Sequence, residues 1–323
     1  MSLLGPYIHN IDPIIGTIFG IHLWWYGLSY TLGFFNAFNF INKRREKLSL
    51  TGPQVYDLCL LITVGVLIGG RLVEVVFYEW EFYSQNLTLI PAYWLGGMAS
   101  HGLLIGGLAA VWIFCRITGH PFLVMTDVMA APASFILGAG RIGNFIDGQI
   151  LGSVTSVPWA VKFPDAEGFR HPVVLYDGIK NLLIIPVLLV VGRRNLPAGF
   201  VTGLFLFLYS FLRIPVDVFR EYPTSLLGLA TGQALNIVLS VIGLAIMTVV
   251  CGMPRVEDDD VRATPSGISN IGWRKPAFVG ILLFCLTMPS DWTQDVPARY
   301  GERHPGLAHS TIYPRLETNV AQD

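Results

Sequence analysis

The chain consists of long apolar blocks separated by short polar segments, a pattern that few folds can accommodate. Hydrophobic residues make up 53% of its 323 residues and charged residues only 13%, whereas soluble domains contain roughly 25% charged residues. A membrane-spanning helix needs about 20 mainly apolar residues. The candidate blocks are 18–41, 56–78, 98–116, 122–143, 173–192, 199–219, 232–252 and a shorter one at 276–289. They predict an all-α integral membrane protein, a polytopic bundle of seven or eight transmembrane helices.

Lysine and arginine residues between the blocks predict the orientation of the spans. Such residues favour the cytoplasmic side. If the spans alternate, one face receives Lys43, Arg44, Arg45, Lys47, Arg116, Arg193, Arg194, Arg255, Arg274 and Lys275. The other face receives 79–97 and 144–172, which are long enough to form a small periplasmic or extracytoplasmic head. We therefore expect 254–275 to be a cytoplasmic linker and 290–323 a polar extracytoplasmic tail.

The charge balance and the cysteines exclude some function classes. The formal net charge is −1, which gives no reason to expect nucleic-acid binding. The four cysteines lie in or beside apolar blocks, and none forms a CxxC pair or a Cys/His cluster with metal-ligand spacing. We interpret them as small buried hydrophobic residues.

Arg141 and Asn144 end the fourth apolar block, in a stretch that also contains Gly140, Gly143 and Gly148. An arginine at membrane depth is costly and therefore usually has a specific partner. Glycines allow another group to approach the backbone closely, and Arg and Asn supply donors that suit a phosphate or a carbonyl. This stretch therefore predicts an anion-binding site at the edge of a bilayer.

A second group of charges lies at the outer end of the sixth block. Arg213 and Asp217 are four residues apart and share a helix face, and Arg220 follows two turns after Arg213. Pro215 should loosen the helix between them. One such pair can be purely structural, but several arginines at the same leaflet favour a site for an anionic head group.

Other polar positions have both a structural and a functional interpretation. Tyr26 follows two tryptophans, as in an interfacial aromatic belt. Arg71 and Glu74 have the spacing of an intrahelical ion pair, for which we favour a structural role. His101, at the outer end of the third block, is either a structural histidine or a base. The Gly102 and Gly106 pair after it predicts close helix packing.

These motifs occur in a recognisable order: 22–28, Gly69-Gly70-Arg71, 96–106, 140–152, Arg170-His171-Pro172 with Leu175-Tyr176-Asp177, and 211–221. In this order and spacing, over roughly residues 15–250, the chain resembles the prolipoprotein diacylglyceryl transferase family. It looks like a divergent member of that family.

The resemblance implies a membrane transferase of lipoprotein biosynthesis in the bacterial inner (plasma) membrane, with its transferase domain at 1–253. Its reaction moves a diacylglyceryl group from phosphatidylglycerol to the lipobox cysteine thiol of a prolipoprotein, and glycerol phosphate leaves. The implied partners are phosphatidylglycerol, prolipoprotein lipobox peptides and the lipid bilayer, with no nucleic acid. No metal or soluble cofactor is implied, and the active site should face the outer leaflet.

The resemblance also assigns roles to residues. Arg141 and Asn144 would hold the lipid head group, and Arg213 would contact the phosphate. His101 is the candidate base or proton carrier. The remaining expected site residues are Tyr26, Gly152, Asp217, which would position Arg213, and Arg220.

The chain departs from the usual family pattern at Leu103, Asp147, Gln149, Ser153, Val173, Val174, Asp177 and Asp217. Gln149 replaces a usual glutamate and so lacks its charge, and the tail lies outside the common pattern. These differences leave two alternatives open. One is a related membrane transferase with a different acceptor or phospholipid donor, and the other is a non-enzymatic lipid-binding or transport protein.

Overall fold

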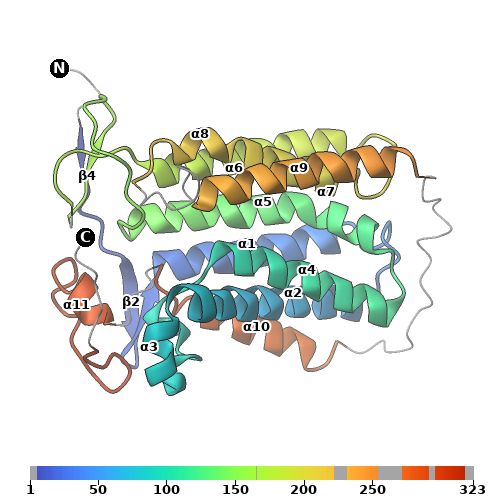
Figure 1. The fold of residues 1–323 in the computed structure, drawn as a ribbon. Coiled ribbons are helices and arrows are strands. Elements are labelled where there is room, and N and C mark those ends of the chain that lie inside the picture. Colours follow the sequence, from blue (N-terminus) through green and yellow to red (C-terminus); the bar gives the residue numbers. More distant parts are fainter. Residues whose placement is uncertain (1–5, 165, 222–230, 254–270, 291–294, 317–323) are drawn as a thin grey trace.

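The computed structural model describes residues 6–164, 166–221, 231–253, 271–290 and 295–316 (Figure 1). The long helices are α1 (Trp25–Asn42), α2 (Gly52–Val73), α4 (Ser100–Thr118), α5 (Phe122–Ile146), α6 (Val173–Val191), α7 (Phe200–Phe211), α9 (Thr231–Cys251) and α10 (Arg274–Cys285). The short ones are η1 (Glu74–Tyr78), α3 (Trp80–Gln85), η2 (Leu87–Leu89), η3 (Tyr93–Leu95), α8 (Arg213–Asp217) and α11 (Val296–Tyr300). The strands are β1 (Tyr7–Ile8), β2 (Ile14–Ile18), β3 (Ile21–Trp24) and β4 (Val161–Lys162).

Six helices in the described ranges are long and apolar enough to cross a membrane. They are Gly52–Tyr78, Ser100–Thr118, Phe122–Ile146, Val173–Val191, Phe200–Asp217 and Gln233–Cys251. Each lies within a few residues of a block predicted from sequence. The structure is therefore that of a helical, multi-pass membrane protein. Most of the predicted linker, residues 254–270, lies outside the described part of the chain.

The predicted first span starts too early. Residues 18–24 are not helical: β2 and β3 form an antiparallel hairpin, and α1 begins only at Trp25. Phe19 and Gly20 make the turn with φ values of 50° and 79°. Positive φ at both central residues of a two-residue turn gives the twist that a β-hairpin needs. The apolar composition of this block therefore concealed a turn and two strands.

The predicted eighth block corresponds to α10, which has 12 residues and is about 18 Å long at 1.5 Å per residue. Arg274, at its start, pairs with Asp57 near the start of α2 (2.7 Å). Beyond its end, the carbonyl of Leu286 accepts a hydrogen bond from the amide of Trp24, just before α1 (2.9 Å). Because α1 and α2 run in opposite directions (Figure 1), α10 and its flanking turns connect opposite ends of the bundle.

The helices form two groups joined through α5 (Figure 1). On one side, α5 packs against α1, which belongs with α2, α4 and α10, and on the other side against α6 and α7, which belong with α8 and α9. The contact between α2 and α4 confirms the predicted close packing. A Cβ atom on Gly102 or Gly106 would collide with backbone carbonyls of α2.

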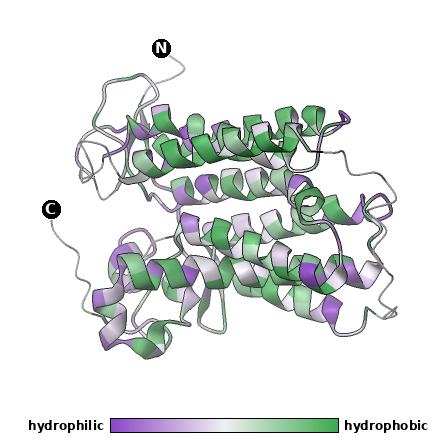
Figure 2. Ribbon diagram, turned by 45° about the vertical axis from the view of Figure 1, so that its right-hand side comes forward, coloured by the Kyte–Doolittle hydropathy of each residue, from purple (hydrophilic) through white to green (hydrophobic). Residues whose placement is uncertain are grey.

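Apolar side chains cover much of the outside of the bundle, whereas polar ones are buried inside it. Figure 2 shows hydrophobic residues along the lengths of the helices. Leu183 in α6 and Ile117 in α4 are 65% and 76% exposed, yet Asp177 and Asn181 are 2% and 0% exposed. An apolar exterior of this extent suits a lipid environment better than water. The polar interior is where the site lies.

One end of the bundle carries the strands and α11 (Figure 1). There the β2–β3 hairpin packs with residues of the 296–316 segment in a separate hydrophobic core. Trp24, Val296, Tyr300 and Tyr313 are almost fully buried in this core. Strand β1 pairs in parallel with β4 from the 144–172 segment. Segments 7–24 and 296–316 thus both contribute to the end where Arg141 lies.

Candidate functional site

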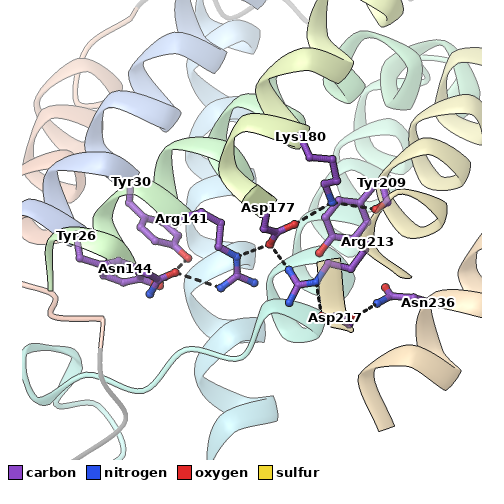
Figure 3. A network of polar contacts seen from close by, with 10 residues as sticks. All are labelled: Tyr26, Tyr30, Arg141, Asn144, Asp177, Lys180, Tyr209, Arg213, Asp217 and Asn236. Carbon is purple, nitrogen blue, oxygen red and sulfur yellow. Dashed lines mark hydrogen bonds and ion pairs between the residues drawn. The ribbon is translucent and has the colours of Figure 1, made fainter. Parts of the chain in front are cut away.

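Asp177 is the centre of a buried network of charges in the bundle (Figure 3). Its Oδ2 accepts from Nε of Arg141 on α5 at 2.7 Å and from Nη1 of Arg213 on α8. Its Oδ1 lies 2.9 Å from Nζ of Lys180, one turn further along α6. One carboxylate therefore holds three cations from three helices in place. Such an arrangement is costly unless every charge is compensated, and it is a feature of functional sites in membranes.

Arg213 links this centre to a second carboxylate. Its Nε donates to Oδ1 of Asp217 at 2.9 Å, as the spacing of four residues predicted, and Nδ2 of Asn236 on α9 donates to Oδ2 at 2.9 Å. Helix α7 ends at Phe211, four residues before Pro215. The proline ring clashes with the carbonyl of the residue four positions earlier. Arg213, the first residue of α8, lies against α6, where it pairs with Asp177.

Arg141 and Asn144 lie on the last turns of α5, and Nη1 of Arg141 donates to Oδ1 of Asn144 at 3.1 Å. Gly143 allows α1 to come close, because a Cβ atom there would lie 2.8 Å from Cα of Tyr26. Tyr26 is buried in the same region, and its hydroxyl is 3.0 Å from that of Tyr30. Gly143 therefore allows the close packing that brings Tyr26 near Arg141.

A small hollow opens between these helices. It is lined by Arg141, Ile150, Val173, Val174, Asp177, Arg213, Val216, Asp217 and Arg220. Its charged lining residues are three arginines, Arg141, Arg213 and Arg220, and two carboxylates, Asp177 and Asp217. The lining therefore has an excess of positive charge, which attracts anions. Among the described residues, the Nη2 amino group of Arg141 has no hydrogen-bond acceptor, so this group is available to a ligand.

The 144–172 segment forms the edge of the site. Gly152 forms an antiparallel bridge with Arg220, and Nη1 of Arg170 donates both to the carbonyl of Gly152 (3.1 Å) and to Glu221. A Cβ atom at Gly152 would collide with the carbonyl of His171. Burial lowers the pKa of His171, whose Nδ1 is 3.1 Å from the Tyr176 hydroxyl. Gly152 thus acts through its backbone by positioning the chain beside Arg220.

His101 is the second residue of α4 and is half-buried. Arg213 and Arg141 are near enough for their charges to act on it. It does not line the hollow, and within the described part of the chain its ring makes no hydrogen bond. The structure therefore brings Arg141, Asn144, Arg213, Asp217 and Arg220 together and leaves His101 at their side.

Arg71 is not part of this site. Its guanidinium donates to the backbone carbonyls of Leu89, Ile90, Ala92, Gly96 and Gly97. These five acceptors match the five N–H donors of an arginine. Glu74 acts on it only as a nearby charge. Arg71 therefore fastens the 89–97 segment, with carbonyls rather than the expected glutamate as its hydrogen-bond partners.

Sequence reasoning did not include Asp177, the centre of the network, among the expected site residues, and it missed three further members of the network. Lys180 also donates to the carbonyl of Tyr209 (3.0 Å), and Asn236 fixes Asp217. The signal for Lys180 was readable, because it is an ionisable residue inside an apolar block and lies three positions after Asp177. No local sequence pattern identifies Asn236 or Tyr209, because their contacts depend on how α9 and α7 pack against the other helices.

The fold and the charge network are those of a multi-pass helical membrane protein with a buried cationic site. A sequence model of the family described as prolipoprotein diacylglyceryl transferase matches residues 13–249. The chain therefore belongs to the prolipoprotein diacylglyceryl transferase family.

Individual relatives agree with this assignment. A phosphatidylglycerol–prolipoprotein diacylglyceryl transferase of Geobacter sulfurreducens is 37% identical over 250 residues, which cover 75% of this chain and 96% of the relative. The proteins of the same name from Pseudoalteromonas atlantica and Mannheimia succiniciproducens are 38% and 40% identical, over 74% and 70% of this chain and 89% and 86% of the relatives.

Proposed function

We propose that this protein is an enzyme that transfers the diacylglyceryl group of phosphatidylglycerol to a prolipoprotein cysteine. The thiol sulfur forms a bond to the terminal glycerol carbon of the diacylglyceryl group. The bond between that carbon and the phosphate oxygen breaks, and glycerol phosphate leaves with the bonding electrons. The thiol proton passes to a base. The family and its named relatives support this reaction.

The excess positive charge around the hollow is the main structural support for this reaction. As the carbon–oxygen bond breaks, negative charge grows on the phosphate, and preorganised cations at that point lower the barrier. Arg141 and Arg213 are held beside the hollow by Asp177. In our proposal the phosphate shares these two arginines with Asp177, and the uncommitted Nη2 of Arg141 is its first donor.

The remaining residues take supporting roles. Asn144 and Arg220 contact the head group, and Asp217 orients Arg213 through the Nε–Oδ1 hydrogen bond. His101 accepts the thiol proton, because it lies near the two arginines and keeps its ring free of other hydrogen bonds among the described residues. Tyr26 packs beside Arg141, and Gly152 fixes the chain next to Arg220.

The topology follows from the same proposal. We infer that α1 is the first crossing and α10 the eighth, and that the end with the strands and α11 is the extracytoplasmic head. The link that α10 makes between opposite ends of the bundle supports this count. The site then lies at the outer leaflet of the bacterial inner membrane, where an anionic lipid and a secreted precursor can both reach it.

The direct test offers the purified protein phosphatidylglycerol and a lipobox peptide. Mass spectrometry should find the thioether-modified peptide, with an equal amount of glycerol phosphate released. A peptide with serine in place of the cysteine should give neither product. Absence of both products, under conditions in which an authentic relative works, would overturn the proposal.

A cellular test separates the related alternative. Expression in bacteria depleted of their own transferase should restore lipoprotein maturation. Phospholipid consumption without restored maturation would instead indicate a transferase with another acceptor.

A further inference from the structure

The C-terminal residues 271–290 and 295–316 lie beyond the part of the chain that the family model matches. They are nevertheless built into the fold. Trp94 donates through Nε1 to the carbonyl of Ile312 (2.9 Å), and the amide of His22 donates to the Tyr313 hydroxyl (3.0 Å). Nδ1 of His304 also lies 2.8 Å from Oδ2 of Asp12, the residue just before the matched region. Side chains and backbone groups of the family core therefore hold this segment in a defined place.

Within the segment, the buried side chain of Asp295 links several residues to one another; Asp295 is 3% exposed. Its Oδ1 accepts from the amide of Ala298 (3.0 Å), where it caps α11, and lies 2.8 Å from Nε2 of His309. Its Oδ2 accepts from the amide of Leu316 (3.2 Å). One buried carboxylate thus joins the start of α11 to the residues that follow it. This joint fixes the direction in which α11 presents its side chains.

Two arginines of this segment contact the loop that follows the Arg141 motif. Nη2 of Arg299 donates to Oε1 of Gln149 at 3.1 Å, and Nη1 of Arg303 donates to the carbonyl of Asp147. The amide of Ser290 donates to Oδ2 of Asp147 at 3.1 Å. Asp147 and Gln149 are 0% and 6% exposed. The loop is therefore buried beneath the C-terminal segment.

The same loop has an unfavourable backbone conformation. Ile150 has a φ of 62°, which is an outlier for a β-branched residue and persists only where the surroundings impose it. Gly148, at φ +72°, has Nη1 of Arg303 2.8 Å from the position of a Cβ atom. Ile150 lines the hollow together with Arg141 and Arg213. Contacts with the C-terminal segment thus act on the shape of the hollow itself.

We propose that the C-terminal segment is an intramolecular clamp of the site, in which Arg299 and Arg303 are positioning residues that hold the 147–150 loop against the hollow. The inference rests on the proposed function for its effect on turnover. Arg299 and Arg303 act through Gln149 and the Asp147 carbonyl. The clamp makes this chain dependent on a segment outside the matched family region.

The test measures amide hydrogen exchange and turnover on the full chain in lipid nanodiscs. In Arg299→Ala/Arg303→Ala, exchange at residues 147–152 should rise about tenfold or more, because hydrogen bonds to charged groups are lost. The KM for phosphatidylglycerol should rise more than kcat falls. Arg315→Ala is the matched control, since Arg315 belongs to the same segment, is exposed and has no described partner.

A thermodynamic cycle shows whether Arg299 acts through Gln149. Adding Arg299→Ala to Gln149→Ala should change exchange and KM little, since the contact is already gone. Gln149→Glu keeps an acceptor for Arg299 and should retain both loop protection and activity. If the loop exchanges equally in the native protein and the double-arginine variant, or if Gln149→Glu loses protection, the clamp is wrong. Exchange is independent of chemistry, so an inert native protein would refute the proposed function and leave this test decisive.

Discussion

Arg71 in α2 and Arg141 in α5 both bring a guanidinium into an apolar part of the bundle, but their partners differ. Arg71 is 2% exposed and donates to five backbone carbonyls of the 89–97 segment. The side chain of Arg141 is 14% exposed, pairs with Asp177 and keeps one amino group without an acceptor among the described residues. The first guanidinium is saturated, whereas the second retains capacity to bind.

The difference shows that burial of a charge does not by itself identify a functional residue. Carbonyl oxygens carry only partial charge and cannot leave the backbone, so Arg71 has a permanent structural task. Arg141 and Arg213 share a carboxylate with each other and with Lys180. A network with more cations than carboxylates can exchange part of its pairing for an anionic ligand. The following substitutions test this comparison.

The largest effect on turnover is expected at the shared arginines. Arg141→Ala or Arg213→Ala should each reduce kcat/KM by about 10²–10³-fold, because each removes a donor to the charge that develops on the phosphate. Initial rates with phosphatidylglycerol and a lipobox peptide measure this loss. Arg116→Ala, at an exposed arginine at the end of α4, is the control and should keep native rates. A native rate in either site variant would remove that arginine from the mechanism.

Arg71→Leu should instead act on stability. It leaves five carbonyls without their donor, and unsatisfied buried groups cost about 1–3 kcal/mol each. We expect a loss of at least about 3 kcal/mol after partial relaxation, measured by unfolding in detergent. The protein that remains folded should bind phosphatidylglycerol with a nearly native KM. A stable Arg71→Leu variant with a selectively raised KM would reverse the comparison.

Lys180→Met tests whether the excess positive charge of the network contributes to lipid binding. It removes one cation from Asp177, so the two arginines are held more tightly by the carboxylate and the network loses its excess charge. The KM for phosphatidylglycerol should rise about threefold to tenfold, as expected for a modest change in electrostatic attraction. Lys162→Met, at a lysine outside the network that contacts the Ala166 carbonyl, provides the comparison. An unchanged KM would indicate that Lys180 serves packing alone.

Tyr93→Phe should have the smallest effect. The Tyr93 hydroxyl donates to the Leu67 carbonyl at 3.2 Å, and its ring lies 5.5 Å from the Arg71 guanidinium carbon. Burial raises the pKa of Tyr93, so the hydroxyl remains a donor at neutral pH. Because phenylalanine keeps the ring, we expect a loss of about 1 kcal/mol for the hydrogen bond, without any kinetic change. A measurable change in KM would connect this structural region to the site.

Most of the helical architecture was predictable because it depends on local composition. Six blocks found from sequence correspond to helices apolar enough to span a membrane. The hairpin at 14–24 was missed because its residues are as apolar as those of α1, so composition does not reveal the turn at Phe19 and Gly20 or the pairing of β2 with β3. For Arg71 the sequence suggested Glu74 as the partner. Its hydrogen bonds go instead to backbone carbonyls 18 to 26 residues further along the chain, which no local pattern reveals.

Local sequence patterns are sufficient to predict most of the helices, the charged residues that they carry and the contacts between residues one turn apart. Arg213 with Asp217 and Lys180 with Asp177 are contacts of this kind, because helix periodicity fixes them. The contacts of Asp177 with Arg141 and Arg213, of Asn236 with Asp217, and of Arg299 and Arg303 with the 147–150 loop could be learned from the folded structure alone. These contacts join separate helices, whose relative positions depend on how glycines, prolines and buried charges pack together.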